Sequence, residues 1–269
     1  MSYGIEEAHN TLKYVSQMSV RGSLVMRYVP NPHVTRKDSV HEHIARIVRL
    51  ATILLPVLRH AFRDDAAVLS ELNHLQTIVS CHDDEEILAM EDIATFIKAH
   101  GADDADEVAK VRANLASLTE AEREYLVAKF ALFRQRKTLS GAPRMVADIA
   151  KVLDNLVGNQ LAIEDRVGMI HPDYVIACLR YVQDYEGKVC DVIDQLIRAQ
   201  VREILAVRAA YSDGGHIEAL AQQWVGEGKG LQETLVRRIR QQLDVDVTKH
   251  VFDNTRSYVP VWEYEVVSD

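Results

Sequence analysis

The chain has 269 residues, of which 48% are hydrophobic and 26% are charged, and its formal net charge is −9. This length and composition are typical of a globular protein with enough apolar residues to bury a core without disulfides. The acidic balance argues against binding of polymeric nucleic acid, because neutralising a phosphate backbone requires clustered Lys and Arg.

The sequence also predicts a cytoplasmic protein without a membrane partner. It contains no apolar run of the 18 or more residues that a membrane helix needs. The first ten residues are acidic and polar, unlike a secretory signal. The three cysteines, Cys81, Cys178 and Cys190, show no CxxC spacing and suit a reducing compartment.

Helical periodicity dominates from residue 4 to about residue 242 and predicts an all-α fold. Ser39 is a suitable N-cap for a helix over 40–55, which Pro56 should kink or end. Similar spacings of apolar residues predict a helix over 66–82 and another over 85–100.

Three more helices are expected in the second half of the chain. Thr119 and Glu122 match a capping box for a helix that runs to about residue 135. The segment 140–143 breaks the chain before a helix over 145–156, and Pro172 opens a long helix to about residue 210.

The closing segment differs in composition. Residues 247–267 are rich in β-branched and aromatic residues, and a turn at 253–255 would fold them as a hairpin. The expected organisation is therefore a helical core over 1–175 and a C-terminal helical extension over 176–269 that ends in this small hairpin.

Four residues with metal-binding side chains occur in the order His43, His82, Asp83 and Asp154, each on an expected helix. Imidazole and carboxylate together suit a divalent transition metal. Adjacent helical residues lie about 100° apart, so His82 and Asp83 can flank one ion from the same helix. Such an ion lowers the pKa of a bound water and neutralises charge on a phosphoryl group.

The ordered pattern H…HD…D resembles the signature of the HD-domain superfamily of metal-dependent phosphohydrolases, and more narrowly its 5′-deoxynucleotidase-like branch. The segment 36–43 resembles the branch's Arg…Val-x-Glu-His element, 82–88 resembles its His-Asp-x-x-Glu-Val-Leu segment, and 152–156 resembles its Ala-Asp-x-Leu element. The similarity covers about residues 20–175. It implies an HD-domain helical bundle in which one ion is held by His43, His82, Asp83 and Asp154.

The resemblance also implies roles for five further residues. Glu86 would act on the attacking water or the leaving group, and its carboxylate suits a general acid or base. Arg27 and Arg36 would bind the substrate phosphate through bidentate hydrogen bonds, with surface salt bridges as the alternative. Tyr28 stands where the branch has Trp near the sugar. Asp92 could match a second carboxylate of the branch, although its spacing along the chain differs by one residue.

Two neighbouring residues compete for the ligand positions. His41 competes with His43, and the Glu-His pair favours His43. Asp148 competes with Asp154 in the same way. Six residues rotate a helix by about 600°, so these two carboxylates cannot both face one point, and the local similarity favours Asp154.

Two charged runs near these motifs are expected to be ordinary solvated faces. Asp84 and Glu85 belong to the acidic run before Glu86, and the same interpretation is the alternative for Glu86 itself. The basic run comprises Arg134, Arg136, Lys137 and Arg144 around a loop, and the alternative is that it borders the pocket.

The resulting prediction is hydrolysis of a phosphate ester of a small nucleotide, namely a (deoxy)nucleoside 5′-monophosphate, with one divalent ion among Mn, Co, Zn, Fe, Ni and Mg. His100 is the only histidine between Asp83 and Asp154, too few for the di-iron oxygenases of the superfamily. Two alternatives stay open: a hydrolase of nucleoside triphosphates or alarmones, and an inactive HD protein that senses a metal or nucleotide. HD proteins commonly dimerise, so the resemblance also implies a homodimer.

Overall fold

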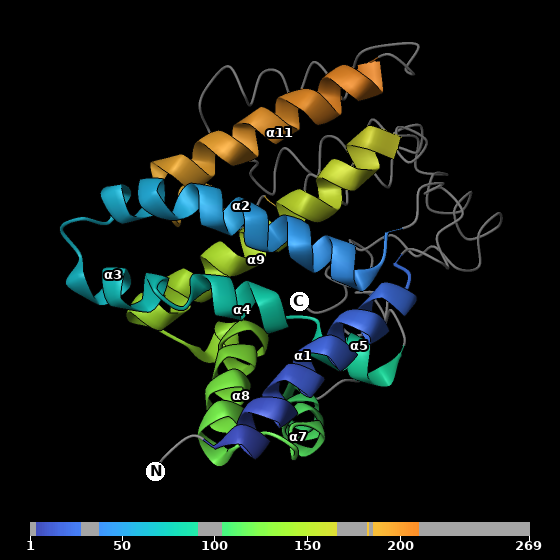
Figure 1. Cartoon of the computed structure of the whole chain (residues 1–269). Helices are drawn as coiled ribbons and strands as arrows, with labels where there is room; N and C mark the ends of the chain where they lie inside the picture. Colours follow the sequence, from blue (N-terminus) through green and yellow to red (C-terminus); the bar gives the residue numbers. More distant parts are fainter. Residues whose placement is uncertain (1–3, 28–37, 91–103, 166–181, 183–184, 210–269) are drawn as a thin grey trace. The chain divides into compact units, whose positions relative to one another are not determined.

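The computed structural model describes residues 4–27, 38–90, 104–165, 182 and 185–209 (Figure 1). Over these residues the regular structure is helical, without a β-strand, and Met26 and Ser39 form an isolated antiparallel bridge. The predicted all-α class is therefore confirmed. Over the same residues, no helix combines the length and the apolar character needed to cross a membrane.

Two compact units divide the chain. Unit 1 comprises Met1–Tyr28 and Lys37–Lys151, and unit 2 comprises Val29–Arg36 and Val152–Asp269. The boundary between Lys151 and Val152 lies within one continuous helix, so this helix contributes residues to both units.

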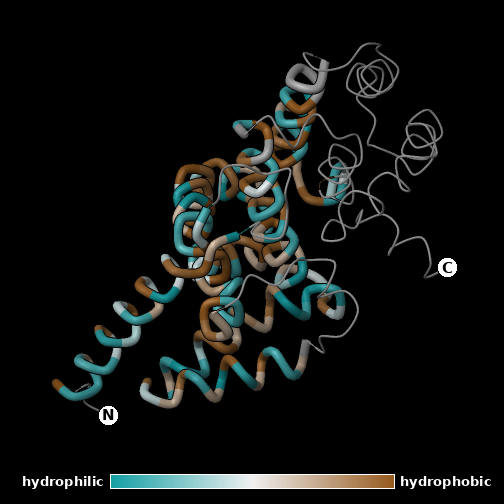
Figure 2. Tube along the Cα trace, turned by 90° about the vertical axis from the view of Figure 1, so that its right-hand side faces the viewer, coloured by the Kyte–Doolittle hydropathy of each residue, from teal (hydrophilic) through white to brown (hydrophobic). Residues whose placement is uncertain are grey.

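Unit 1 is built from helices. In chain order they are α1 (Ile5–Leu24), α2 (Val40–Ala61), α3 (Ala66–Leu72), α4 (Leu75–Cys81), α5 (Asp84–Ala89), α7 (Asp104–Asn114), α8 (Glu120–Arg134), the 3-10 helix η1 (Arg136–Thr138) and the first turns of α9 (Gly141–Asp165). α4 packs against α2 and α8, α7 packs against α8, and α1 packs against α2 and α5 (Figure 1). Hydrophobic and hydrophilic residues alternate around the helices in Figure 2, as expected for amphipathic elements.

α2 begins with the predicted capping box. The Oγ of Ser39 accepts a hydrogen bond from the Glu42 amide at 3.2 Å, and Oε2 of Glu42 accepts one from the Ser39 amide at 2.9 Å. Of the two outcomes expected at Pro56, a kink or an end, the helix does not end there but continues to Ala61. Its buried face extends beyond the proline to Leu58, and tertiary burial of this kind stabilises helical turns that local propensity disfavours.

The helix expected over 66–82 is interrupted. It is divided into α3 and α4 at Asn73 and His74, and a second break at His82 and Asp83 separates α4 from α5. α5 ends at Ala89, and the rest of the helix expected over 85–100 lies outside the described residues.

Two apolar clusters join the helices of unit 1. The larger cluster connects α4, α7 and α8 and comprises Cys81, Val111, Leu115, Leu118, Val127 and Phe130. The smaller cluster comprises Val25, Val40 and Ile87, and it anchors α5 to the start of α2 and to the residue after α1. The capping box predicted for α8 is also present, formed by Thr119 and Glu122.

Unit 2 contains the rest of α9 and α11 (Asp191–Ala209). Buried side-chain amides join these helices: Asn159 Nδ2 donates to Gln200 Oε1 at 3.1 Å, and Gln200 Nε2 donates to the Leu156 carbonyl at 2.7 Å. The domain boundary expected at residue 175 and the hairpin expected over 247–267 lie outside the described residues.

Candidate metal site

Two buried histidines lie close together in unit 1. His43 belongs to the buried face of α2 and is 2% exposed, and His82 is the C-cap residue of α4 and is 1% exposed. Their ring centroids lie 5.6 Å apart. Two imidazoles at this separation can bind one ion between them.

The orientation of His82 is set by the backbone and by an aromatic neighbour. Its Nδ1 lies 2.8 Å from the carbonyl oxygen of Val79, and since a carbonyl can only accept, Nδ1 carries the proton and donates it. Nε2 then keeps its lone pair for a metal, which is the usual arrangement at a metal-binding histidine. The Phe133 ring packs edge-on against the His82 ring at a centroid distance of 5.0 Å.

Asp83 brings a carboxylate to the same point. Its Oδ2 lies 3.1 Å from Nε2 of His82 and 4.0 Å from Nε2 of His43. Ligand atoms about 2.1 Å from a metal lie about 3.0–3.4 Å apart when adjacent and about 4.2 Å apart across an octahedron. The two nitrogens and the oxygen therefore have the separations and the chemistry of a divalent metal site.

The local backbone differs from the helical geometry expected for the His-Asp pair. Asp83 has φ −111° and ψ 21°, so His82 and Asp83 form the break between α4 and α5 rather than part of one helix. The two side chains consequently do not follow the 100° step of consecutive helical residues. This break places the Asp83 carboxylate beside the imidazole of its own neighbour.

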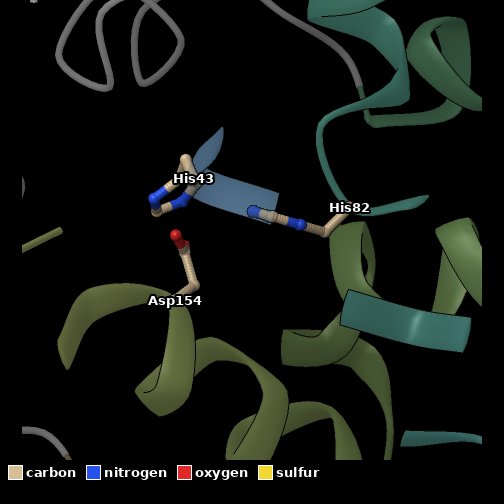
Figure 3. A group of neighbouring side chains, drawn as sticks. All are labelled: His43, His82 and Asp154. Carbon is tan, nitrogen blue, oxygen red and sulfur yellow. The ribbon is translucent and has the colours of Figure 1, made fainter. Parts of the chain in front are cut away.

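Asp154 is the fourth expected ligand. It lies on α9, three residues after Lys151, and is 8% exposed. The potential ligand atoms of His43, His82 and Asp154 all lie within 4.8 Å of one another, and the three side chains point toward one another in Figure 3. These buried groups could hold a metal ion.

The competing residues have other partners. His41 is exposed on α2 and lies 3.5 Å from the Ser19 hydroxyl. Asp148 accepts a hydrogen bond of 2.5 Å from Arg144 and lies 4.0 Å from Arg136. Among the described residues, His43 and Asp154 are thus buried, whereas His41 is exposed and Asp148 is paired with arginine.

The acidic run at the site is not solvated, so the expectation for Asp84 and Glu85 is wrong. Asp83, Asp84, Glu85 and Glu86 are all buried. The Tyr14 hydroxyl donates to Oδ2 of Asp84 at 3.4 Å. Burial, and then the charge of Glu85, raise the pKa of Asp84 to about 8, so this carboxyl carries a proton at pH 7.

Arg134 is half-buried and paired with carboxylates instead of belonging to a solvated basic face. Its guanidinium contacts Glu85 of α5, with Nη1 3.5 Å from Oε1, and it forms a second ion pair with Glu107 of α7. The sequence does not reveal these contacts, because they join residues that are far apart in the chain.

Glu86 lies beside the candidate ligands. Carboxylate oxygens of Asp83, Glu85 and Glu86 all lie within 4.8 Å of one another, and Glu86 belongs to the first turn of α5. Its position one short turn after Asp83 places a carboxylate where it can exchange a proton with a water at the site.

Arg27 is the expected phosphate-binding residue that the structure describes. Its Nη1 lies 3.6 Å from Oδ2 of Asp83, and its backbone amide donates to the Asp38 carbonyl at 2.6 Å. The other three residues expected to bind substrate, namely Tyr28, Arg36 and Asp92, lie outside the described residues.

Comparison with known proteins gave no match: no family model, no curated protein and no solved structure is similar to this chain.

Proposed function

We propose that this protein is an HD-type, metal-dependent phosphohydrolase that releases phosphate from a nucleoside 5′-monophosphate. The observation that carries the proposal is the convergence of Nε2 of His43, Nε2 of His82 and Oδ2 of Asp83 in a buried site. Imidazole and carboxylate ligands bind Mn, Fe, Co, Ni or Zn, and buried charges of this kind are stabilised by a cation. Asp154 would complete the ligand set for one ion.

The residues around the ligands suit phosphoester hydrolysis. A divalent ion supplies a more acidic water and neutralises charge on the phosphoryl group when it is bound. The water oxygen attacks phosphorus, the bond from phosphorus to the nucleoside oxygen breaks, and a proton passes from the water to that oxygen. Glu86 takes the proton from the water and returns it to the leaving nucleoside, as a general base and then a general acid.

The charges of unit 1 favour one phosphoryl group over a chain of three. Arg27 and Arg134 are the guanidinium groups that the described residues place against site carboxylates, and Arg134 is held by two glutamates. Arg27 is therefore the guanidinium suited to a phosphate, which it can bind with two parallel hydrogen bonds. A triphosphate would bring several more negative charges into a site that already holds an acidic run.

The test is phosphate release from ribo- and deoxynucleoside mono-, di- and triphosphates, measured with Mn²⁺, Co²⁺, Mg²⁺ or EDTA. We expect metal-dependent release of inorganic phosphate from monophosphates, and its loss in Asp83→Ala. Release of pyrophosphate or tripolyphosphate would instead show a hydrolase of longer phosphate chains. Nucleotide binding without any turnover would contradict the enzyme and favour a sensor.

A further inference from the structure

Arg134, the last residue of α8, joins three helices of unit 1. One nitrogen of its guanidinium, Nη1, lies 3.5 Å from Oε1 of Glu85 on α5, and the other, Nη2, pairs with Oε2 of Glu107 on α7. The Arg134 side chain is 14% exposed, and each glutamate side chain is 7% exposed. The end of α8 is thus tied to both α5 and α7 inside the protein.

This arrangement requires the shape of arginine. Burying a carboxylate is costly unless a partner offsets its charge, and here two carboxylates share one cation. A planar guanidinium presents several donors in a fixed fork and can contact both carboxylates at once, whereas the single ammonium of lysine acts as a point charge. We therefore expect that no other residue at position 134 would keep the contacts that Arg134 makes with both Glu85 and Glu107.

The contact with Glu85 bears directly on the candidate metal site. Glu85 lies between Asp83 and Glu86 in the chain, and carboxylate oxygens of all three lie within 4.8 Å of one another. Because α5 has only six residues, it is too short to hold its own conformation, and tertiary contacts must fix it.

Contacts with other parts of unit 1 hold α5 in place. Ile87 packs against Val25 and Val40, and Leu88 packs against the larger apolar cluster. Asp84 accepts the hydrogen bond from Tyr14, and Arg134 adds an ionic contact through Glu85. The residue before Arg134 is Phe133, which packs against His82, so the end of α8 contacts both a candidate metal ligand and α5.

We infer that Arg134 is a positioning residue of the metal site. Its ion pair with Glu85 holds α5 so that Asp83 and Glu86 face the ion and its water. Arg134 does not contact the reacting groups itself. The expected effect of Arg134 on turnover rests on the proposed function. Its expected effect on metal binding does not, because metal affinity is measured without a substrate.

The test compares Arg134→Gln and Arg134→Lys with the wild-type protein. Mn²⁺ affinity is measured by titration calorimetry, kcat and KM are measured with the best nucleotide, and folding is checked by the thermal midpoint. Loss of a residue that orients metal ligands typically weakens metal affinity or activity about 10- to 100-fold. We expect such a loss in kcat or Mn²⁺ affinity for Arg134→Gln with KM nearly unchanged, and partial recovery in Arg134→Lys.

Arg112→Gln is the matched control. Arg112 pairs with Glu124 and thereby also joins α7 to α8, but at an exposed position without a contact to α5 in the structure. We expect Arg112→Gln to keep Mn²⁺ affinity and kcat within about twofold of the wild type, as for most surface substitutions. A purely structural role would lower the thermal midpoint of Arg134→Gln without changing Mn²⁺ affinity or kcat, and this result would overturn the inference.

A double-mutant cycle keeps the inference testable if Arg134→Gln folds poorly. Glu85→Gln and Arg134→Lys are measured singly and together. If Arg134 acts through Glu85, the two losses in Mn²⁺ affinity are less than additive; additive losses would refute the inference. Failure of the wild-type protein to hydrolyse any nucleotide would refute the proposed function alone, because the Mn²⁺ titrations still decide whether Arg134 positions the site.

Discussion

At the scale of single residues, the four acidic side chains from Asp83 to Glu86 have different surroundings. Asp83 lies beside two imidazoles and Arg27, Asp84 beside Tyr14, and Glu85 beside Arg134. Neighbouring residues of one short segment therefore have different partners. The clearest contrast is between Asp83, which we propose as an ionised metal ligand, and Asp84, whose raised pKa keeps it neutral at pH 7.

The substitutions Asp83→Asn and Asp84→Asn make the same chemical change at adjacent positions. Asp83→Asn should weaken Mn²⁺ binding at least about 10-fold at pH 7, because an amide is a poorer ligand than a carboxylate. Asp84→Asn should leave Mn²⁺ affinity within about threefold, since the protonated carboxyl that it replaces is already neutral. Titration calorimetry measures both affinities. Equal losses in the two variants would contradict the separate roles.

The sequence offers His43, His82, Asp83 and Asp154 as a ligand set, because their order resembles a family pattern, and their role as metal ligands stays a prediction. The sequence does not indicate Tyr14, Phe133 and Arg134, which support the site from α1 and α8. These residues contact the site only after the helices have packed. No local spacing in the sequence marks them.

At the scale of helices, the boundaries that depend on local hydrogen bonds could be predicted. The capping boxes at Ser39 and Thr119 are formed within four residues, and both are present. The break at Asn73 and His74 could not be predicted, because the apolar spacing runs through it without a glycine or proline to mark it. α2 continues past Pro56 to Ala61, because burial of its face outweighs the lost hydrogen bond.

Ser39→Ala should lower the free energy of unfolding by about 1 kcal/mol, the usual value of an N-cap side chain. The substitution removes the acceptor for the Glu42 amide at the start of the helix that carries His43. Ser23→Ala on α1 is the control, because Ser23 is exposed and bonds only to the Ser19 carbonyl in the structure. Urea unfolding of the two variants measures the difference. Equal midpoints would show that the capping box contributes nothing.

At the scale of the whole molecule, each unit has its own buried polar contacts. Unit 1 contains the buried side chains of His43, His82 and Asp83 and the ion pairs of Arg134, and unit 2 buries the amides of Asn159 and Gln200 between α9 and α11. Buried amides stabilise a specific packing only while each donor and acceptor is paired. This makes Gln200 a sensitive probe of unit 2.

Gln200→Leu should destabilise the protein by about 1–3 kcal/mol, because the Leu156 carbonyl and the Asn159 amide each lose a buried hydrogen-bond partner. Glu203→Ala, which removes an exposed bond to Gln160 on the same pair of helices, should change stability by less than about 0.5 kcal/mol. Thermal unfolding of both variants provides the measurement. A similar midpoint shift in both would show that burial of the Gln200 amide is unimportant.

Anomalous diffraction from a crystal grown with Mn²⁺ would locate the one divalent ion that we propose at His43, His82, Asp83 and Asp154. We predict one strong anomalous peak per chain, about 2.0–2.3 Å from Nε2 of both histidines and from an oxygen of each aspartate. No peak at these side chains at saturating Mn²⁺, or a strong peak elsewhere that leaves them without metal, would contradict the metal site and the hydrolase built on it.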